Sequence, residues 1–226
     1  MIDRASWLAS RRAVVVATYD AEAATFDDEP YPATGHRALV DRLLATCPPD
    51  GLVLDAPCGT GRYFAQVRAS GRRVVGIDQS PGMLAQAAAT RLAERVALIG
   101  LQELAEVATF DAAMTIDAME NVPSEDWPLV LANLRRAVRP GGHLYLTVEE
   151  VDEAEIDAAY ATAIAAGLPV IRGEVVDGDT AGYHYYPGRE RVVHWFDGAA
   201  LTVIEEQLQP EDGWSYRHWL VRTPAS

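Results

Sequence analysis

The sequence of 226 residues contains no lysine, because all 19 of its basic side chains are arginine. This absence excludes several kinds of chemistry. There is no P-loop lysine for a nucleotide phosphate and no Schiff-base lysine for pyridoxal phosphate or a carbonyl substrate, and the strand lysine of protein kinases is missing as well. An alanine-rich composition without lysine is also what a GC-rich genome would produce.

Positive charge is scarce overall. The chain carries 33 acidic side chains against 19 basic ones, which gives a formal net charge of −14. A protein of this charge repels phosphate backbones, so we expect no nucleic acid partner. The densest acidic run, residues 149–157, is interpreted as the solvated start of a helix, where acids are favourable.

Cysteine is scarce as well. Cys47 and Cys58 lie eleven residues apart and form no C-x-x-C motif, so the sequence indicates neither a disulfide framework nor a zinc site. A reducing cytoplasm is the expected location. The apolar run at 13–17 is far too short to span a membrane, and we expect neither a signal peptide nor a membrane partner.

Between about residues 51 and 149, short apolar runs alternate with helical patterns. The runs predict five strands, at 52–54, 74–77, 96–99, 112–116 and 144–148. The patterns between them predict helices at 62–69, 81–92 and 127–138, the last ended by Pro140-Gly141-Gly142. Apolar strands separated by helices are typical of a parallel sheet covered on both faces. With right-handed crossovers, this predicts a doubly wound α/β domain.

The two ends of the chain differ from this centre. Residues 1–50 contain two helical patterns, and a further helix is expected from 151 to about 166. A glycine- and aromatic-rich stretch follows at 178–188, and then a helix that ends near 197. Two final strands, 201–207 and 215–222, are joined by so short a turn that they must be antiparallel.

The segment 53–64 combines a strand, a tight glycine turn and the start of a helix. Glycine in such a turn lets the backbone approach a ligand closely and point amides at it. The second strand ends at Asp78, 17 residues after Gly61. This is the usual place for an acid that accepts both hydroxyls of an adenosine ribose.

The glycine turn does not suit a dinucleotide. A dinucleotide fingerprint needs a small residue three positions after its second glycine, where this chain has Phe64. Asp55, at the head of the turn, would repel a pyrophosphate and suits a ligand that bears an ammonium group. A nucleoside amino acid is therefore favoured, and an NAD(P)-dependent oxidoreductase is the weaker alternative.

Four segments in this order resemble the class I S-adenosylmethionine-dependent methyltransferases that act on small molecules. They are 55–61, with proline at the first glycine of the family motif, then 76–84, 110–122 and 134–142. The resemblance implies a Rossmann-like seven-stranded sheet, mostly parallel with an antiparallel last strand, and helices on both faces. It also implies S-adenosyl-L-methionine as cofactor and methyl transfer to an oxygen or nitrogen. A non-catalytic or repurposed cofactor-binding scaffold stays open as an alternative.

The resemblance implies a cofactor site made of the glycine turn, the ribose acid, the residues around the adenine and the tip of the fourth strand. These residues are Asp55, Ala56, Pro57, Gly59, Gly61, Asp78, Gln79, Met83, Leu101, Gln102, Ile116 and Asp117. The chain departs from the family after the third strand, where Gly-Asp is usual and this sequence reads Ile-Gly-Leu-Gln. Gln102 or the Leu101 backbone would then bind the adenine amino group.

A hydroxyl or protonated amine acceptor also needs a base. The candidates lie on segments expected to cap the strand tips, and they are Tyr31, His36, Glu120, Glu149 and His184. We expect no metal, because Asp117 and Asn121 lack a third carboxylate.

The expected organisation is a single domain that works as a monomer or homodimer. Its parts are a helical cap (1–50), the cofactor-binding core (51–150), a lid over the small-molecule methyl acceptor (151–190) and a C-terminal helix with a strand pair (191–226).

Overall fold

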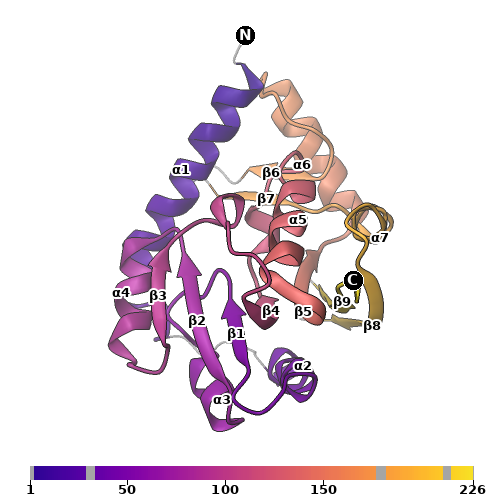
Figure 1. The fold of residues 1–226 in the computed structure, drawn as a ribbon. Coiled ribbons are helices and arrows are strands. Elements are labelled where there is room, and N and C mark those ends of the chain that lie inside the picture. The colour runs from indigo at the N-terminus through magenta and orange to yellow at the C-terminus, as the bar shows by residue number, and fades with distance from the viewer. Residues whose placement is uncertain (1–2, 29–33, 177–181, 211–214, 226) are drawn as a thin grey trace.

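The computed structural model describes residues 3–28, 34–176, 182–210 and 215–225. A seven-stranded sheet is flanked by helices on both faces, and a two-stranded sheet lies apart from it (Figure 1). The strands of the large sheet are β1 (Leu52–Asp55), β2 (Arg73–Asp78), β3 (Arg95–Leu98), β4 (Phe110–Thr115), β5 (Val138–Glu150), β8 (Thr202–Pro210) and β9 (Ser215–Arg222). The small sheet pairs β6 (Glu174–Val176) with β7 (Tyr183–Tyr185).

Helices and short 3-10 turns precede or connect the strands. They are α1 (Arg4–Glu22), α2 (Thr34–Ala45), α3 (Phe64–Ala69), α4 (Pro81–Ala89), η1 (Leu101–Glu103), η2 (Met119–Asn121), α5 (Trp127–Ala137), α6 (Glu153–Ala165) and α7 (Arg189–Gly198).

The large sheet has the strand order β3-β2-β1-β4-β5-β9-β8. Strands β1 to β5 pair in parallel, whereas β9 is antiparallel to both of its neighbours, β5 and β8. The predicted fold class is therefore confirmed: the sheet is mostly parallel, and its last strand in sequence is the antiparallel one.

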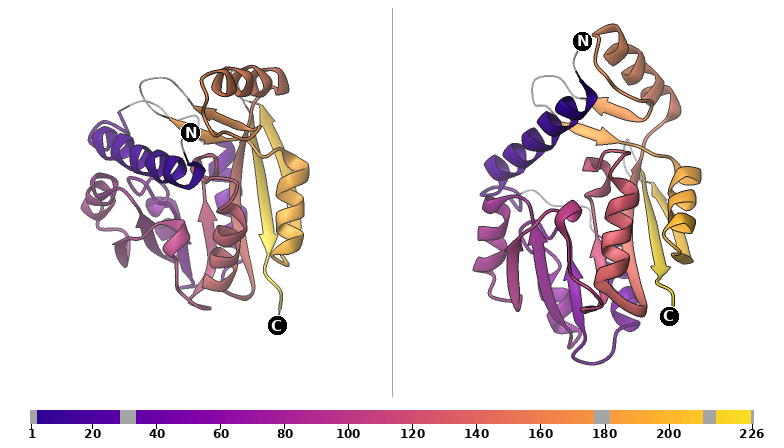
Figure 2. Two further views of the ribbon diagram at one scale, coloured as in Figure 1. Left: turned by 90° about the horizontal axis from the view of Figure 1, so that it is seen from above. Right: turned by 45° about the horizontal axis from the view of Figure 1, so that its top comes forward.

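Successive residues of a strand pack in two different hydrophobic cores, one on each face of the sheet. Val53 packs in a cluster with α2 and α3, whereas its neighbour Leu54 packs in the cluster that contains α5 and α7. Tyr145 and Leu146 of β5 divide in the same way. Because both faces are covered, as Figure 2 shows, both sets of side chains must be apolar. This explains why the strands read as continuous apolar runs and not as an alternating pattern.

Helix α1 and the small sheet lie beyond the carboxyl ends of the parallel strands (Figures 1 and 2). A buried ion pair joins them, in which Arg4 Nη2 lies 2.8 Å from Glu174 Oε1 and the Glu174 side chain is fully buried. Tyr183 donates a 2.6 Å hydrogen bond to the same carboxylate. These contacts fix the start of α1 against the small sheet.

Two features differ from the sequence prediction. The helix predicted to 138 ends at Ala137, and Pro140-Gly141-Gly142 lie inside the first part of β5, where the register with β4 shifts. The stretch at 178–188 contains the unpredicted strand β7, and residues 177–181 lie outside the described residues. The predicted turn at 210–213 falls mostly outside them too.

Two histidines, one on α2 and one on β9, are buried with their rings in contact. His36 is 2% exposed and His218 is 1% exposed, and their rings lie 5.1 Å apart. The Tyr145 hydroxyl hydrogen-bonds His218 Nδ1 at 2.9 Å, while Nε2 of that ring has no partner within the described residues. Burial lowers the pKa of each imidazole to about 4, so both rings are neutral at neutral pH.

Acid should therefore destabilise the protein through these histidines. A histidine whose pKa falls from 6.5 to about 4 on folding stabilises the fold fully above pH 6.5, and this contribution is lost as the pH falls towards 4. We expect His218→Gln to lose less stability than the wild type over that range, as measured by urea unfolding. His194→Gln on α7, at an exposed position, is the control and should follow the wild type. Parallel curves for wild type and His218→Gln would contradict the prediction.

Candidate functional site

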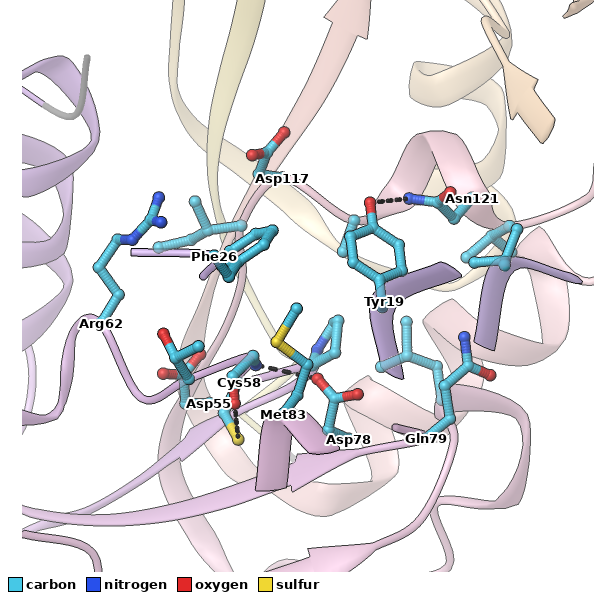
Figure 3. A pocket seen from close by; sticks show the side chains of 18 of the residues that line it. Tyr19, Phe26, Asp55, Cys58, Arg62, Asp78, Gln79, Met83, Asp117 and Asn121 are labelled. Carbon is cyan, nitrogen blue, oxygen red and sulfur yellow. Dashed lines mark hydrogen bonds between the residues drawn. The ribbon is translucent and has the colours of Figure 1, made fainter. Parts of the chain in front are cut away.

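A cavity opens at the carboxyl edge of the sheet, beside the tips of β1 and β4 (Figure 3). Its empty space amounts to about 1070 Å³ when the open mouth is included. Its walls come from α1 and the turn after it, the loop after β1, the tip of β2, η1 and the segment after β4. The lining residues are Arg12, Val15, Tyr19, Phe26, Asp55, Pro57, Cys58, Gly59, Thr60, Arg62, Tyr63, Asp78, Gln79, Met83, Leu101, Gln102, Ile116, Asp117, Ala118, Asn121 and Val122.

The loop after β1 leaves room and unpaired polar atoms in the cavity. Asp55 is 1% exposed, and its Oδ2 has no hydrogen-bond partner among the described residues. Burial, and next the charge of Asp78, raise the pKa of the Asp55 carboxyl well above its usual range. Gly59 has φ +52, and a Cβ placed there would meet no atom within 4 Å. A ligand can therefore approach this backbone closely.

Asp78 stands at the end of β2 and is held by the backbone. Its Oδ2 accepts from the Gly59 N–H at 2.9 Å, and its Oδ1 accepts from the Ser80 N–H at 2.9 Å. Burial raises the pKa of this carboxyl, and the backbone hydrogen bonds oppose that shift. Each carboxylate oxygen keeps a further lone pair, so the group is oriented to accept hydroxyl donors from the cavity.

The end of the cavity beside η1 and α4 is lined by Met83, Leu101 and Gln102. The Gln102 side chain donates a 3.1 Å hydrogen bond to Asp126 Oδ2, which also accepts from Arg12 of α1 at 2.6 Å. The backbone carbonyls of η1 are tied to Asn133. This end therefore combines an apolar surface with a fixed amide.

Helix α1 forms one wall of the cavity through a single stripe of side chains. Val15 and Tyr19 lie one turn apart, and Phe26 follows just after the helix. At the end of the helix, Asp20 Oδ1 accepts hydrogen bonds from the Ser80 hydroxyl at 3.1 Å and the Gly82 N–H at 2.5 Å. These contacts attach α1 to the start of α4.

Three acidic residues lie at the carboxyl ends of β4 and β5, with Asp117 and Glu120 just after β4 and Glu149 in the last part of β5. Asp117 lines the cavity, its amide donates to Thr147 Oγ1 at 2.7 Å, and its Oδ1 accepts a short hydrogen bond from the Tyr216 hydroxyl. Burial, and next the charge of Asp117, raise the pKa of Glu120 well above its usual range. The same two causes raise the pKa of Glu149 to about 7.

The predicted bases do not line the cavity in the described structure. His36 is buried behind Tyr63 and Tyr216, with its Nδ1 3.4 Å from the Tyr63 hydroxyl and its ring edge against Tyr216. His184 is on β7, where its Nδ1 lies 3.2 Å from the Tyr186 hydroxyl.

Two of the remaining candidates, Glu120 and Glu149, do not line the cavity either. Glu120 is 4% exposed and hydrogen-bonded to Asn121, while Tyr31 lies outside the described residues. These positions therefore do not place His36, Glu120 or His184 in contact with an acceptor in the cavity.

Of the twelve predicted cofactor residues, ten line the cavity, and Ala56 and Gly61 do not. The lining residues that sequence reasoning missed include Arg12, Val15 and Phe26. An apolar stripe on α1 indicates that one helix face is buried but not that it faces a cavity. No described residue of 151–190 lines the cavity, although that segment was expected to form the lid.

No group of histidine, cysteine, aspartate and glutamate side chains among the described residues has an arrangement that would hold a metal ion. None of the described helices is long and apolar enough to cross a membrane.

The raised pKa of Glu149 predicts a pH-dependent stability. A carboxyl whose pKa rises from 4.5 to about 7 on folding stabilises the fold fully below pH 4.5, and this contribution is lost as the pH rises to about 7. Glu149→Gln should therefore become more stable relative to the wild type as the pH rises through this range, as measured by urea unfolding. Glu190→Gln, an exposed change on α7, is the matched control. An unchanged difference between Glu149→Gln and wild type across the range would refute this.

Comparison with known proteins gives consistent matches. A family model described as a methyltransferase domain matches residues 53–142. The demethylmenaquinone methyltransferase of Corynebacterium kroppenstedtii is 33% identical over 170 residues, which cover 74% of this chain and 71% of that protein. The malonyl-[acyl-carrier protein] O-methyltransferase of Serratia marcescens is 38% identical over 127 residues, or 55% of this chain. The match spans only 46% of the Serratia protein, so the chain corresponds to about half of that relative.

A solved structure has the same fold over nearly the whole chain. The 1,6-didemethyltoxoflavin-N1-methyltransferase of Burkholderia thailandensis, with bound S-adenosylhomocysteine, superposes with a TM-score of 0.73 at 21% identity. The superposition covers 99% of this chain and 92% of that one.

Proposed function

The chain belongs to the class I S-adenosylmethionine-dependent methyltransferases, and on this premise we propose that it transfers a methyl group from S-adenosylmethionine to an oxygen or nitrogen of a small molecule. The observation that carries the proposal is one cavity that holds both an unpaired buried carboxylate, Asp55, and an oriented one, Asp78. The first suits an ammonium group and the second a pair of ribose hydroxyls.

The residues of the cavity fit this cofactor. Asp55 Oδ2 and Thr60 Oγ1 are buried without partners among the described residues, and a buried polar atom left unpaired is costly. Hydrogen bonds from the amino acid part of the cofactor would satisfy them. Gly59 leaves the space that this part needs, and Gln79 and Met83 line the cavity where an adenine would lie.

Gln102 takes the adenine amino group in this proposal. The usual aspartate is missing after β3, but the Gln102 amide nitrogen is already bonded to Asp126, which leaves its carbonyl oxygen to accept from the adenine. Arg12 supports this arrangement by binding the same Asp126 carboxylate.

When bound, the cofactor supplies an activated methyl group on a sulfonium. The protein must then align the acceptor and take up a proton where the acceptor carries one, and alignment alone is worth about 7–11 kcal/mol. Asp117 is the base that we propose, because it lines the cavity and the Tyr216 hydroxyl fixes its carboxylate. Tyr19 and Phe26 from α1 exclude water from the same space.

We further propose that one domain does this work, as a monomer or homodimer in the cytoplasm and without nucleic acid. The net charge of −14 disfavours a phosphate backbone, and both cysteines are buried free thiols, which suits a reducing compartment.

The direct test is binding and turnover. Purified protein should bind S-adenosylmethionine in calorimetry and form S-adenosylhomocysteine with at least one member of a panel of small alcohols, phenols and amines. Binding without transfer to any acceptor would favour the scaffold alternative. Displacement of S-adenosylmethionine by NAD would favour an oxidoreductase.

Removal of the Asp78 carboxylate should weaken the cofactor site. We expect Asp78→Ala to weaken S-adenosylhomocysteine binding by well over tenfold, since it removes the proposed ribose acceptor. Asp111→Ala is the matched control, because Asp111 also accepts a backbone N–H, from Leu52 at 2.7 Å, but lies outside the cavity. An affinity for Asp78→Ala equal to that of the control would refute the ribose assignment.

A side chain at Gly59 should close the loop. Gly59→Val would place a branched side chain in the space proposed for the cofactor, and we expect its affinity to fall by more than tenfold. Gly71→Val is the control, because Gly71 has φ +77 and a Cβ there also meets nothing within 4 Å, but it does not line the cavity. Equal losses in both variants would mean that backbone strain, and not the site, is responsible.

A further inference from the structure

A second cavity lies between the first turns of α1, the segment after α6 and the end of β6. Its lining residues are Ser6, Trp7, Ser10, Arg11, Leu168 and Val176. Figure 1 shows this half of α1 beside the small sheet. The empty space amounts to about 710 Å³ when the open mouth is included. The two cavities share none of their described lining residues, so a ligand here would not occupy the proposed cofactor site.

Arg11 differs from the other two arginines of α1 in its surroundings. Arg4 is paired with the buried carboxylate of Glu174, and Arg12 is paired with Asp126. Arg11 Nε is hidden from solvent and has no hydrogen-bond partner in the described part of the chain. This is unexpected in a protein whose acidic side chains outnumber the basic ones by 33 to 19.

The unpaired guanidinium is a donor that the fold itself leaves unsatisfied. The acid nearest to Arg11 on its N-terminal side is Asp3, and that carboxylate caps the start of α1 by accepting from the Ser6 N–H at 3.0 Å and the Ser6 hydroxyl at 2.8 Å. A hidden donor without a partner is costly, and an arginine side chain does not lose its proton in proteins. A bound anion would supply the missing acceptor.

The other walls of this cavity are apolar, and they select among anions. Trp7 is 5% exposed, and its ring is held edge to face against Tyr183 of β7 with centroids 5.9 Å apart. Leu168 and Val176 are partly buried and pack against the same core as Trp7. A guanidinium fork matches carboxylates and phosphates alike, but these neighbours favour an anion that carries an apolar body.

We propose that this cavity is a second binding site, for a small molecule with a carboxylate at one end of an apolar body. The carboxylate accepts from the Arg11 guanidinium, and the body lies against Trp7, Leu168 and Val176. The site is separate from the methyl-transfer site and does not depend on the proposed function.

Three probes test the class of ligand. They are 3-phenylpropanoate, its neutral analogue 3-phenylpropanamide, and inorganic phosphate, each titrated by calorimetry at neutral pH. We expect 3-phenylpropanoate to bind at least tenfold more tightly than either of the others, because only it combines a carboxylate with an apolar body. Equal affinity for the amide, equal affinity for phosphate, or no binding of 3-phenylpropanoate would overturn the proposal.

Two variants locate the binding. Arg11→Gln should weaken 3-phenylpropanoate at least tenfold and leave the amide unchanged, while Arg135→Gln, an exposed change on α5, should alter neither. Ser10→Phe keeps the guanidinium but fills the cavity from an exposed position, and it should weaken 3-phenylpropanoate at least tenfold as well. Wild-type affinity in either Arg11→Gln or Ser10→Phe would overturn the proposal.

The arginines of the first cavity, Arg12 and Arg62, are the competing location for a carboxylate. Both already pair with acids, so Arg12→Gln and Arg62→Gln should bind 3-phenylpropanoate within twofold of the wild type. Saturation with S-adenosylhomocysteine should leave that affinity unchanged too. A tenfold loss in either variant, or displacement by S-adenosylhomocysteine, would overturn the proposal. Failure to bind S-adenosylhomocysteine at all would count against the methyltransferase function alone, since the variants decide the question without it.

Discussion

The site depends on one constraint, which is that two neighbouring parallel strands send the chain to opposite faces of the sheet. β1 and β4 are paired, but α3 after β1 packs on one face and α5 after β4 packs on the other. The segments that leave the two strand tips must therefore separate. Asp55 and Asp117, at or just beyond those tips, line the space that opens between them.

Helix α1 turns this open space into a cavity, and it is attached at three different points. Arg4 binds Glu174 of the small sheet, Arg12 binds Asp126 beside η1, and Asp20 binds the start of α4. Exposed ion pairs contribute little on their own, whereas breaking a pair with a fully buried partner such as Glu174 is costly. The small sheet thus shapes the cavity indirectly, through the position of α1.

Local sequence was sufficient to predict the core of the fold and many of the residues that line the cavity. Asp55, Gly59 and Asp78 each lie at the end of an apolar run or in the turn after it, so a short segment fixes both their place in the sheet and their direction. The β6–β7 pair depends on contacts between residues about ten positions apart, such as Glu174 with Tyr185, and the glycine-rich stretch between them gives no strand signal.

The surroundings of the candidate bases could not be predicted, because burial decides what each of them contacts. His36 was a reasonable base by residue type, yet its ring lies behind Tyr63 and Tyr216, and nothing in the neighbouring sequence indicates this. The cavity-lining face of α1 is equally hidden, since an apolar stripe packs as well against a solid core as against a cavity.

A single physical effect accounts for the opposite shifts of the buried acids and histidines. Burial penalises whichever form is charged, so it lowers the pKa of His36 and His218 and raises that of Asp55 and Glu149. The site thereby loses internal cations while it keeps acids at its strand tips. In a chain without lysine, the cavity-lining arginines Arg12 and Arg62 already pair with Asp126 and Asp27. A cationic cofactor bound in the cavity would favour the ionised form of Asp55 and so lower its pKa again.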